Sequence, residues 1–147
     1  MSSLRLPASE DSLSALRQLA LDAAKHAKLD QAILQRVELV LEEALMNIVR
    51  HAYPPDAPER LVALDCEAGE GTLRLNITDW GAPFDPVAPA NHRQEATLEA
   101  NLEADLEHRA PGGLGLFFIR SMAQASYARQ GGANVLTLRF STQAAAS

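Results

Sequence analysis

The sequence has few lysines and a single cysteine, and both shortages exclude kinds of site. Lys25 and Lys28 are the only lysines among the 147 residues, and both precede the first glycine. A phosphate-binding loop of the G-x-x-x-x-G-K-[ST] type needs a lysine directly after a glycine, so the chain has none. The one cysteine, Cys66, excludes an internal disulfide framework and a multi-cysteine metal knuckle. The four histidines form no close-spaced zinc pattern.

Long hydrophobic runs and an excess of positive charge are also absent. No apolar stretch reaches membrane-spanning length, and the first seven residues lack the apolar run of a signal peptide. The formal net charge is -6, from 13 Lys and Arg against 19 Asp and Glu, which argues against bulk attraction to nucleic acid phosphates. We therefore expect a cytoplasmic protein that binds neither a membrane nor nucleic acid directly.

The composition is that of a folded domain, with 47% hydrophobic and 22% charged residues. At this length we expect a single domain over residues 1–147. Hydrophobic periodicity and turn signals predict helices over residues 9–29, from an Asp30 cap to about residue 52, and over residues 116–122, with strands over 60–67, 72–79, 126–129 and 135–140. This order predicts an α+β fold, a two-layer α/β sandwich whose mostly antiparallel sheet carries helices on one face.

Two loops complete the prediction. Residues 68–71, Ala-Gly-Glu-Gly, are typical of a hairpin turn. Residues 81–111 form a stretch rich in proline, asparagine and acidic residues. Loops of this length inside a compact domain are usually functional lids or disordered segments.

The first candidate site lies on the second helix. Glu43, Asn47 and His51 are spaced i, i+4 and i+8, so they line one side of that helix. A carboxylate and a neutral oxygen donor in line suit a magnesium–phosphate group, and a carboxylate can also polarise an attacking hydroxyl. A solvated helix face with an ion pair explains the same spacing and stays open.

Two further candidates follow along the chain. Asp79 continues the apolar face of its strand, next to Trp80 and Gly81, where its carboxylate could accept a hydrogen bond from an exocyclic amine such as that of adenine. The alternative is that Asp79 only caps the turn. Gly113 and Gly115 lie in a Gly-Gly-Leu-Gly run that opens a helix, where free amides favour an anion without any lysine. A flexible hinge is the alternative for that run.

Taken together, these motifs resemble those of the Bergerat or GHKL ATP-binding domain, shared by gyrases, histidine kinases and MutL-like ATPases. Residues 43–47 resemble its N box, residues 79–81 its first glycine box and residues 113–115 its second. More narrowly, the chain is similar to the bacterial anti-sigma-factor serine/threonine kinases. That similarity is carried by residues 42–53, 84–86, 112–116 and 134–138.

The resemblance implies a role for each motif residue. Glu43 would be the general base toward a substrate hydroxyl, and Asn47 would ligate the Mg²⁺ held by the ATP phosphates. Asp79 would bind the adenine amino group, with Gly81 beside the base. The remaining implied positions are the triphosphate contacts Gly113 and Gly115, a mobile ATP lid at about residues 85–111, and Arg50 and His51 as weaker candidates for phosphate or partner contacts.

The resemblance also implies a function and partners. It implies an ATP-dependent serine/threonine protein kinase that acts as an anti-sigma factor, binds a sigma factor, and phosphorylates an anti-anti-sigma protein of the STAS fold. A homodimer is implied only through the family. The alternative is a non-catalytic ATP-binding module that sequesters a sigma factor or another partner. The chain departs from the wider superfamily at Pro83, where a second glycine is common.

Overall fold

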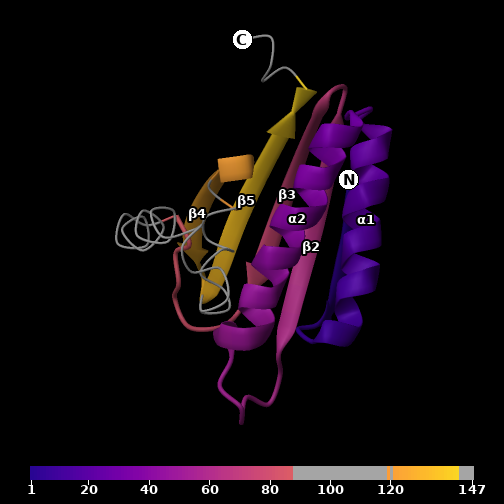
Figure 1. Ribbon diagram of the computed structural model, residues 1–147. Helices are drawn as coiled ribbons and strands as arrows, with labels where there is room; N and C mark the ends of the chain where they lie inside the picture. The colour runs from indigo at the N-terminus through magenta and orange to yellow at the C-terminus, as the bar shows by residue number, and fades with distance from the viewer. Residues whose placement is uncertain (88–118, 120, 143–147) are drawn as a thin grey trace, which may run out of the picture.

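In the computed structural model, which describes residues 1–87, 119 and 121–142, five strands form one sheet and two helices cover one of its faces (Figure 1). Each pair of neighbouring strands is antiparallel, in the order β1-β2-β3-β5-β4. The strands are β1 (Ser2–Pro7), β2 (Leu61–Gly69), β3 (Thr72–Asp79), β4 (Gln124–Gln130) and β5 (Ala133–Ser141). The predicted α+β sandwich is confirmed.

The helical layer contains α1 (Leu13–His26) and α2 (Gln31–Asn47). A single 3-10 turn, η1 (Glu10–Ser12), precedes α1, and α2 continues into a π-helical turn, η2 (Ile48–Ala52). The predicted cap of the second helix is confirmed, because the Asp30 carboxylate accepts a hydrogen bond from Ile33 N at 2.9 Å. Ser9 is the N-cap residue of η1, but its side chain makes no capping hydrogen bond.

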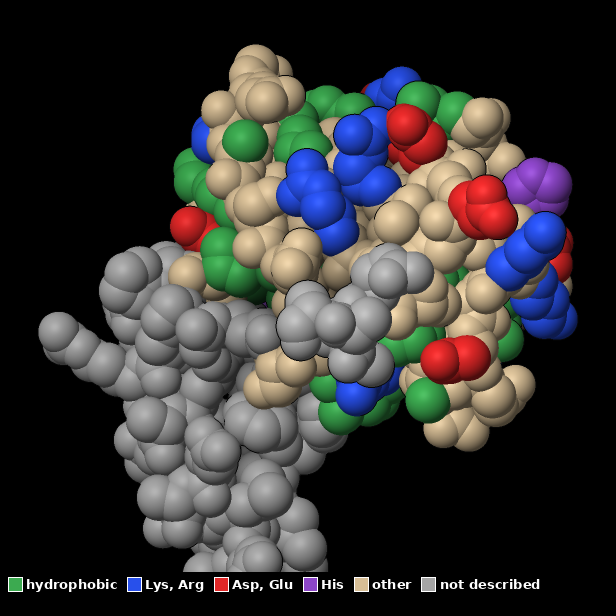
Figure 2. Space-filling view, turned by 90° about the horizontal axis from the view of Figure 1, so that it is seen from above, with side chains coloured by type: hydrophobic (Ala, Val, Ile, Leu, Met, Phe, Trp, Pro, Cys, Tyr) green, Lys and Arg blue, Asp and Glu red, His purple; other side chains and the backbone are tan. Residues whose placement is uncertain are grey.

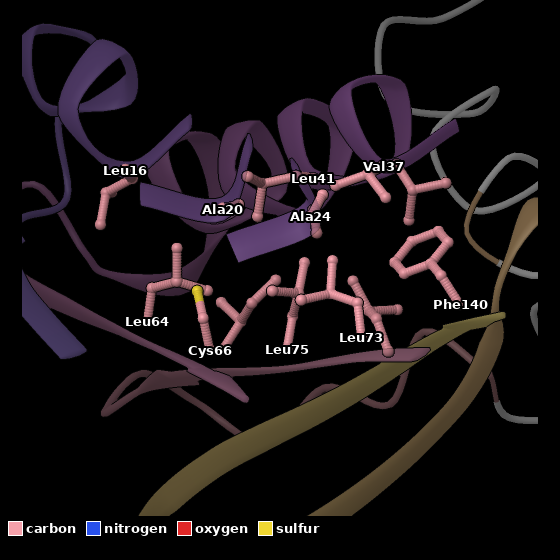
Figure 3. Packing of buried hydrophobic residues seen from close by; sticks show 14 of the residues in the cluster. Leu16, Ala20, Ala24, Val37, Leu41, Leu64, Cys66, Leu73, Leu75 and Phe140 are labelled. Atoms are coloured by element: carbon pink, nitrogen blue, oxygen red, sulfur yellow. The ribbon is translucent and has the colours of Figure 1, made fainter. Parts of the chain in front are cut away.

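The core lies between the two helices and the sheet (Figure 3). Helix α1 buries a stripe with the 3–4 residue spacing of an amphipathic helix, and α2 does the same toward the sheet. Each fully buried leucine contributes about 1.5–3 kcal/mol relative to an exposed one. Buried positions include Leu16, Ala20 and Ala24 on α1, Ile33, Val37, Val40, Leu41, Ala44 and Leu45 on α2, and Val62, Leu64, Cys66, Leu73, Leu75, Ile77, Leu136, Leu138 and Phe140 on the sheet. Ile48, the first residue of η2, is half-buried.

A tight connection joins α1 to α2. Lys28 has a φ of 62°, and the amides of Lys28 and Leu29 bond back to the carbonyls of Lys25 and Ala24 at 3.0 and 3.3 Å. These two bonds form a Schellman motif, in which a glycine usually supplies the positive φ. The turn between β2 and β3 packs beside this end of α1, because Gly71 N donates to Ala27 O at 2.8 Å.

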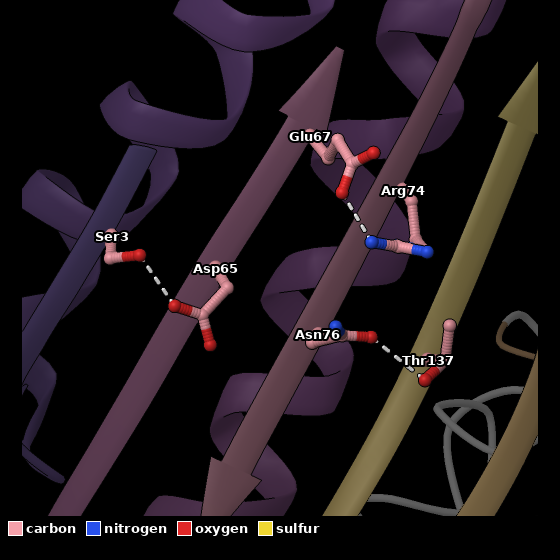
Figure 4. A network of polar contacts seen from close by, with 6 residues as sticks. All are labelled: Ser3, Asp65, Glu67, Arg74, Asn76 and Thr137. Atoms are coloured by element: carbon pink, nitrogen blue, oxygen red, sulfur yellow. Dashed lines mark hydrogen bonds and ion pairs between the residues drawn. The ribbon is translucent and has the colours of Figure 1, made fainter. Parts of the chain in front are cut away.

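The other face of the sheet is polar. Ser3 donates to Asp65 at 2.5 Å and Thr137 donates to Asn76 at 2.8 Å, across neighbouring strands (Figure 4). Arg74 pairs with Glu67 on the same face. At the end that carries the β2–β3 turn, basic and acidic side chains lie side by side on the described surface (Figure 2).

Two features, strand β1 and the β2–β3 turn, differ from the sequence prediction. Strand β1 was not predicted, although Leu4 and Leu6 alternate there with polar residues. The β2–β3 turn is only two residues long, because β2 extends to Gly69 and β3 begins at Thr72. Ile119, Ser121 and Met122 are helical, as predicted, whereas the rest of that helix lies outside the described residues.

Candidate functional site

The end of the second helix meets the turn that follows β3. Ala82 N donates to Ala52 O, the last residue of η2, at 3.3 Å. A Cβ built on Gly81 would lie 2.1 Å from the same Ala52 oxygen, so only glycine fits there. Two of the predicted patches, 36 positions apart between Glu43 and Asp79, are therefore carried by elements that touch.

Tyr53 fastens this junction. Its hydroxyl donates to Leu61 O at 2.5 Å and accepts from Trp80 N at 2.8 Å. Burial raises the pKa of the Tyr53 hydroxyl above its ordinary value, so the hydroxyl stays protonated and keeps its donor hydrogen. On the outer side, the Arg5 guanidinium stacks over the Trp80 ring at 4.5 Å from the centroid. The first residue after β3 is thus held from both sides.

Asp79 is buried at the end of β3, with 6% of its surface exposed. Its Oδ1 atom accepts hydrogen bonds from Gly81 N and from Asn134 Nδ2, both at 2.9 Å. No hydrogen bond joins Oδ2 to any residue that the structure describes. The turn-capping alternative is therefore correct for Oδ1, and Oδ2 is left as an acceptor.

Asn134 forms a polar hub at the start of β5. It lies opposite Asp79 in the sheet register and is 5% exposed. Its Nδ2 atom also donates to Ala82 O at 2.9 Å. Its Oδ1 atom accepts from the Tyr127 hydroxyl at 2.5 Å, Arg129 Nη1 at 3.2 Å and Phe84 N at 3.3 Å. These partners hold the turn after Asp79 from β4 and β5.

Asn134 was not predicted as a site residue, although it lies in the 134–138 stretch that helps to carry the family resemblance. Asn134 shares the inward face of β5 with Leu136 and Leu138, as Asp79 shares the inward face of β3 with Ile77. At both positions a polar residue stands at the end of a row of apolar residues. This pattern can indicate a site residue, but it led to a prediction only for Asp79.

On α2, Glu43 and Asn47 are half-buried, whereas His51 and Arg50 are exposed. Burial raises the pKa of the Glu43 carboxyl, and the adjacent Glu42 carboxylate adds to the rise while Arg50 opposes it. Glu42 itself is paired with Arg17 at 3.2 Å. Asn47 is the last residue of α2, one π turn before Ala52.

Glu43 and Asn47 fit a hard cation, because both supply oxygen atoms from one helix face. In the described part of the chain, no group of three His, Cys, Asp or Glu side chains could hold a metal ion by itself. A Mg²⁺ here would need further oxygens from a phosphate ligand or from water.

The third predicted patch, Gly113 and Gly115, lies outside the described residues, as do residues 88–111 of the predicted lid.

A cavity of about 220 Å³ lies at the other end of the sheet, lined in part by Ile33, Met122 and Phe140. None of the described helices is long and apolar enough to cross a membrane.

Comparison with known proteins defines the class. Residues 6–140 match the model of the histidine kinase-like ATPase domain, and the chain belongs to that family. It is 26% identical over 138 residues to the serine-protein kinase RsbW of Staphylococcus epidermidis. That alignment covers 93% of this chain and 84% of the relative. It is also 37% identical over 101 residues to the serine/threonine-protein kinase BtrW of Bordetella bronchiseptica. That alignment covers 68% of this chain and 65% of the relative.

A solved structure shows the same fold. The histidine kinase domain from the Erythrobacter litoralis EL346 blue-light activated histidine kinase superposes with a TM-score of 0.53 at 15% sequence identity. The match covers 94% of this chain but 63% of that one. The predicted resemblance to this family of ATPase domains is confirmed.

Proposed function

We propose that this protein is an ATP-dependent serine/threonine protein kinase that acts as an anti-sigma factor and phosphorylates an anti-anti-sigma protein of the STAS fold. The observation that carries the proposal is the contact of Ala52 with Gly81 and Ala82, which joins the Glu43–Asn47 helix face to the Asp79 turn. The similarity to two proteins named as serine or serine/threonine kinases supports the same reaction.

Asp79 would recognise the base. Its Oδ2 atom, which no described residue bonds, would accept a hydrogen bond from the exocyclic amine of adenine. Gly81 would lie beside the ring, because its lack of a Cβ already permits one close backbone approach. Trp80 and Phe84, both exposed, lie in the residues that follow Asp79.

Glu43 would act as the general base. A carboxyl whose pKa is raised by burial holds a proton more strongly than an ordinary glutamate, so it is better suited to accept one from a serine or threonine hydroxyl. Bound ATP would supply the γ-phosphoryl group, and Mg²⁺ would neutralise its charge. Asn47, one helical turn from Glu43, would ligate that Mg²⁺ through its amide oxygen.

The remaining assignments depend on the family resemblance and on the composition. Gly113 and Gly115 would contact the triphosphate through their amides, and residues 85–111 would form a lid over it within a single domain of residues 1–147. A sigma factor would be the second partner. We place the protein in the cytoplasm on its composition.

The test is transfer of labelled γ-phosphate from Mg-ATP to a candidate STAS protein. The wild type should transfer phosphate, and Glu43→Gln should bind ATP with near wild-type affinity while losing transfer by roughly a hundredfold or more. Glu38→Gln is the matched control, because Glu38 is an exposed glutamate on the same helix. The rate should also fall as the pH is lowered through the raised pKa of Glu43.

Two results would redirect the proposal. ATP binding without any transfer to STAS proteins would reject the kinase. Unchanged partner regulation in Glu43→Gln would favour the non-catalytic sequestering module instead.

A further inference from the structure

We infer that Asn134 is a positioning residue for base recognition: its amide holds one oxygen of Asp79 so that the other faces the exocyclic amine of adenine. The inference rests on the proposed function and deepens it, because it names what sets base specificity in that site. It starts from the geometry of the Asn134 hub, whose partners come from β3, β4 and the turn after β3.

The amide of Asn134 has one orientation that satisfies its neighbours. Its oxygen faces three donors, and its nitrogen faces two acceptors, Asp79 Oδ1 and Ala82 O. A flipped amide would set NH₂ hydrogens against the Phe84 N–H and the Arg129 N–H, which can only donate, and a carbonyl oxygen against the two acceptors, although the Tyr127 hydroxyl could turn to accept. Such buried mismatches are costly, so the donor to Asp79 is fixed.

Because this donor is fixed, the two carboxylate oxygens of Asp79 have different roles. Gly81 N and Asn134 Nδ2 both bind Oδ1, so the carboxylate cannot tilt without breaking two bonds. If the group turns over, the oxygens exchange places and the arrangement is the same. One oxygen is held in either case, and among the described residues none bonds the other oxygen.

Arg129 strengthens the hub. Its Nη1 atom donates to Gly81 O at 2.8 Å and to Asn134 Oδ1 at 3.2 Å. A cation at the amide oxygen polarises the amide and makes its N–H a better donor to Asp79. Arg129 thereby supports the carboxylate without pairing with it, which leaves the charge of Asp79 for the ligand.

The experiment compares Mg-ATP with the Mg complex of purine riboside triphosphate, which lacks the 6-amino group. Binding of both is measured by calorimetry to the wild type, Asn134→Ala, Asn134→Asp and Tyr127→Phe. The matched control is Asn76→Ala, which removes an asparagine with a side-chain partner from the opposite face of the same sheet.

The wild type should prefer ATP by roughly tenfold or more, since one hydrogen bond to a charged group is involved. In Asn134→Ala the preference should fall to within about threefold, mainly through weaker ATP binding. Asn76→Ala should keep the wild-type preference. Tyr127→Phe removes one donor to Asn134 and should give a smaller loss.

Asn134→Asp adds a pH signature. At low pH the protonated carboxyl that this variant carries at position 134 can donate to Asp79 as the amide does, whereas at higher pH two carboxylates would face each other. The preference for ATP should therefore decline as the pH rises in this variant and stay level in the wild type. A residue that only supports the fold would give no such change in base preference.

The outcomes separate the inference from the proposed function. A folded Asn134→Ala that keeps the wild-type preference overturns the inference and leaves ATP binding intact. If Asn134→Ala does not fold, unchanged preferences in Tyr127→Phe and in Asn134→Asp at every pH overturn it. A wild type that binds neither nucleotide overturns both.

Discussion

Asp79→Asn should reverse the base preference of the proposed site. The substitution keeps the shape of the side chain but replaces one oxygen with an NH₂ group. Gly81 N and Asn134 Nδ2 both donate to the Oδ1 position, so the new amide must place its oxygen there. The amide nitrogen then takes the place of Oδ2, and the site presents a donor instead of an acceptor.

The magnitude follows from the bond that is lost. A hydrogen bond to a charged group contributes about 1.5–3 kcal/mol, so ATP affinity should fall by roughly 10- to 150-fold. Inosine triphosphate carries an oxygen at the 6-position and should bind the variant better than ATP does. The free energy of unfolding should change by about 1 kcal/mol or less, because both bonds to the Oδ1 position are kept.

Calorimetric titration of wild type and variant with the Mg complexes of both nucleotides measures this reversal. Asp65→Asn is the matched control, since it makes the same change on the outer face of the sheet, where Asp65 bonds Ser3. An Asp79→Asn protein that binds ATP within twofold of the wild type and gains nothing for inosine triphosphate would refute the reasoning.

Three other predictions concern stability. Gly81→Ala should lower the free energy of unfolding by about 1–3 kcal/mol, because its Cβ would overlap Ala52 O; an unchanged urea midpoint would contradict it. Lys28→Gly should raise that free energy by about 0.5–1 kcal/mol by relieving the positive φ, and lower stability in the same urea series would argue against it. Burial raises the pKa of the Cys66 thiol from 9.0 to about 11, so the unfolded chain loses this proton first. Stability should then fall between those pH values by at most about 1.4 kcal/mol per pH unit. Cys66→Ala should lack this component of the alkaline decline, and an identical pH profile would exclude it.

The sequence predicted the elements whose signals are local and long. The apolar periodicity of α2 and the alternation along β3 repeat over several turns or residues, and the Asp30 cap depends only on the residues that follow it, so each could be recognised without any partner. Strand β1 was missed because its alternation spans only residues 3–6, and its place depends on pairing with β2, about sixty positions away.

In the candidate site, too, only the features with a local sequence signal were predicted. The shared face of Glu43 and Asn47 follows from their four-residue spacing, and Asp79 was noticed because it interrupts an apolar row. The bond between Asn134 and Asp79 joins residues 55 positions apart. Only the strand register brings them together, so no local pattern could show which carboxylate oxygen remains available.

The π turn η2 has a consequence for changes in chain length. A π turn holds one more residue than an α turn, and such turns often arise in helices at functional positions. Deleting Val49 would let the helix continue as α and would leave the later residues close to their present positions, because the π turn accommodates the extra residue within the helix. A deletion within the regular part of α2 would instead turn every later residue by about 100° around the axis, and the Tyr53 ring would leave both Leu61 O and Trp80 N. A single-codon deletion in η2 should therefore be tolerated better than one in α2.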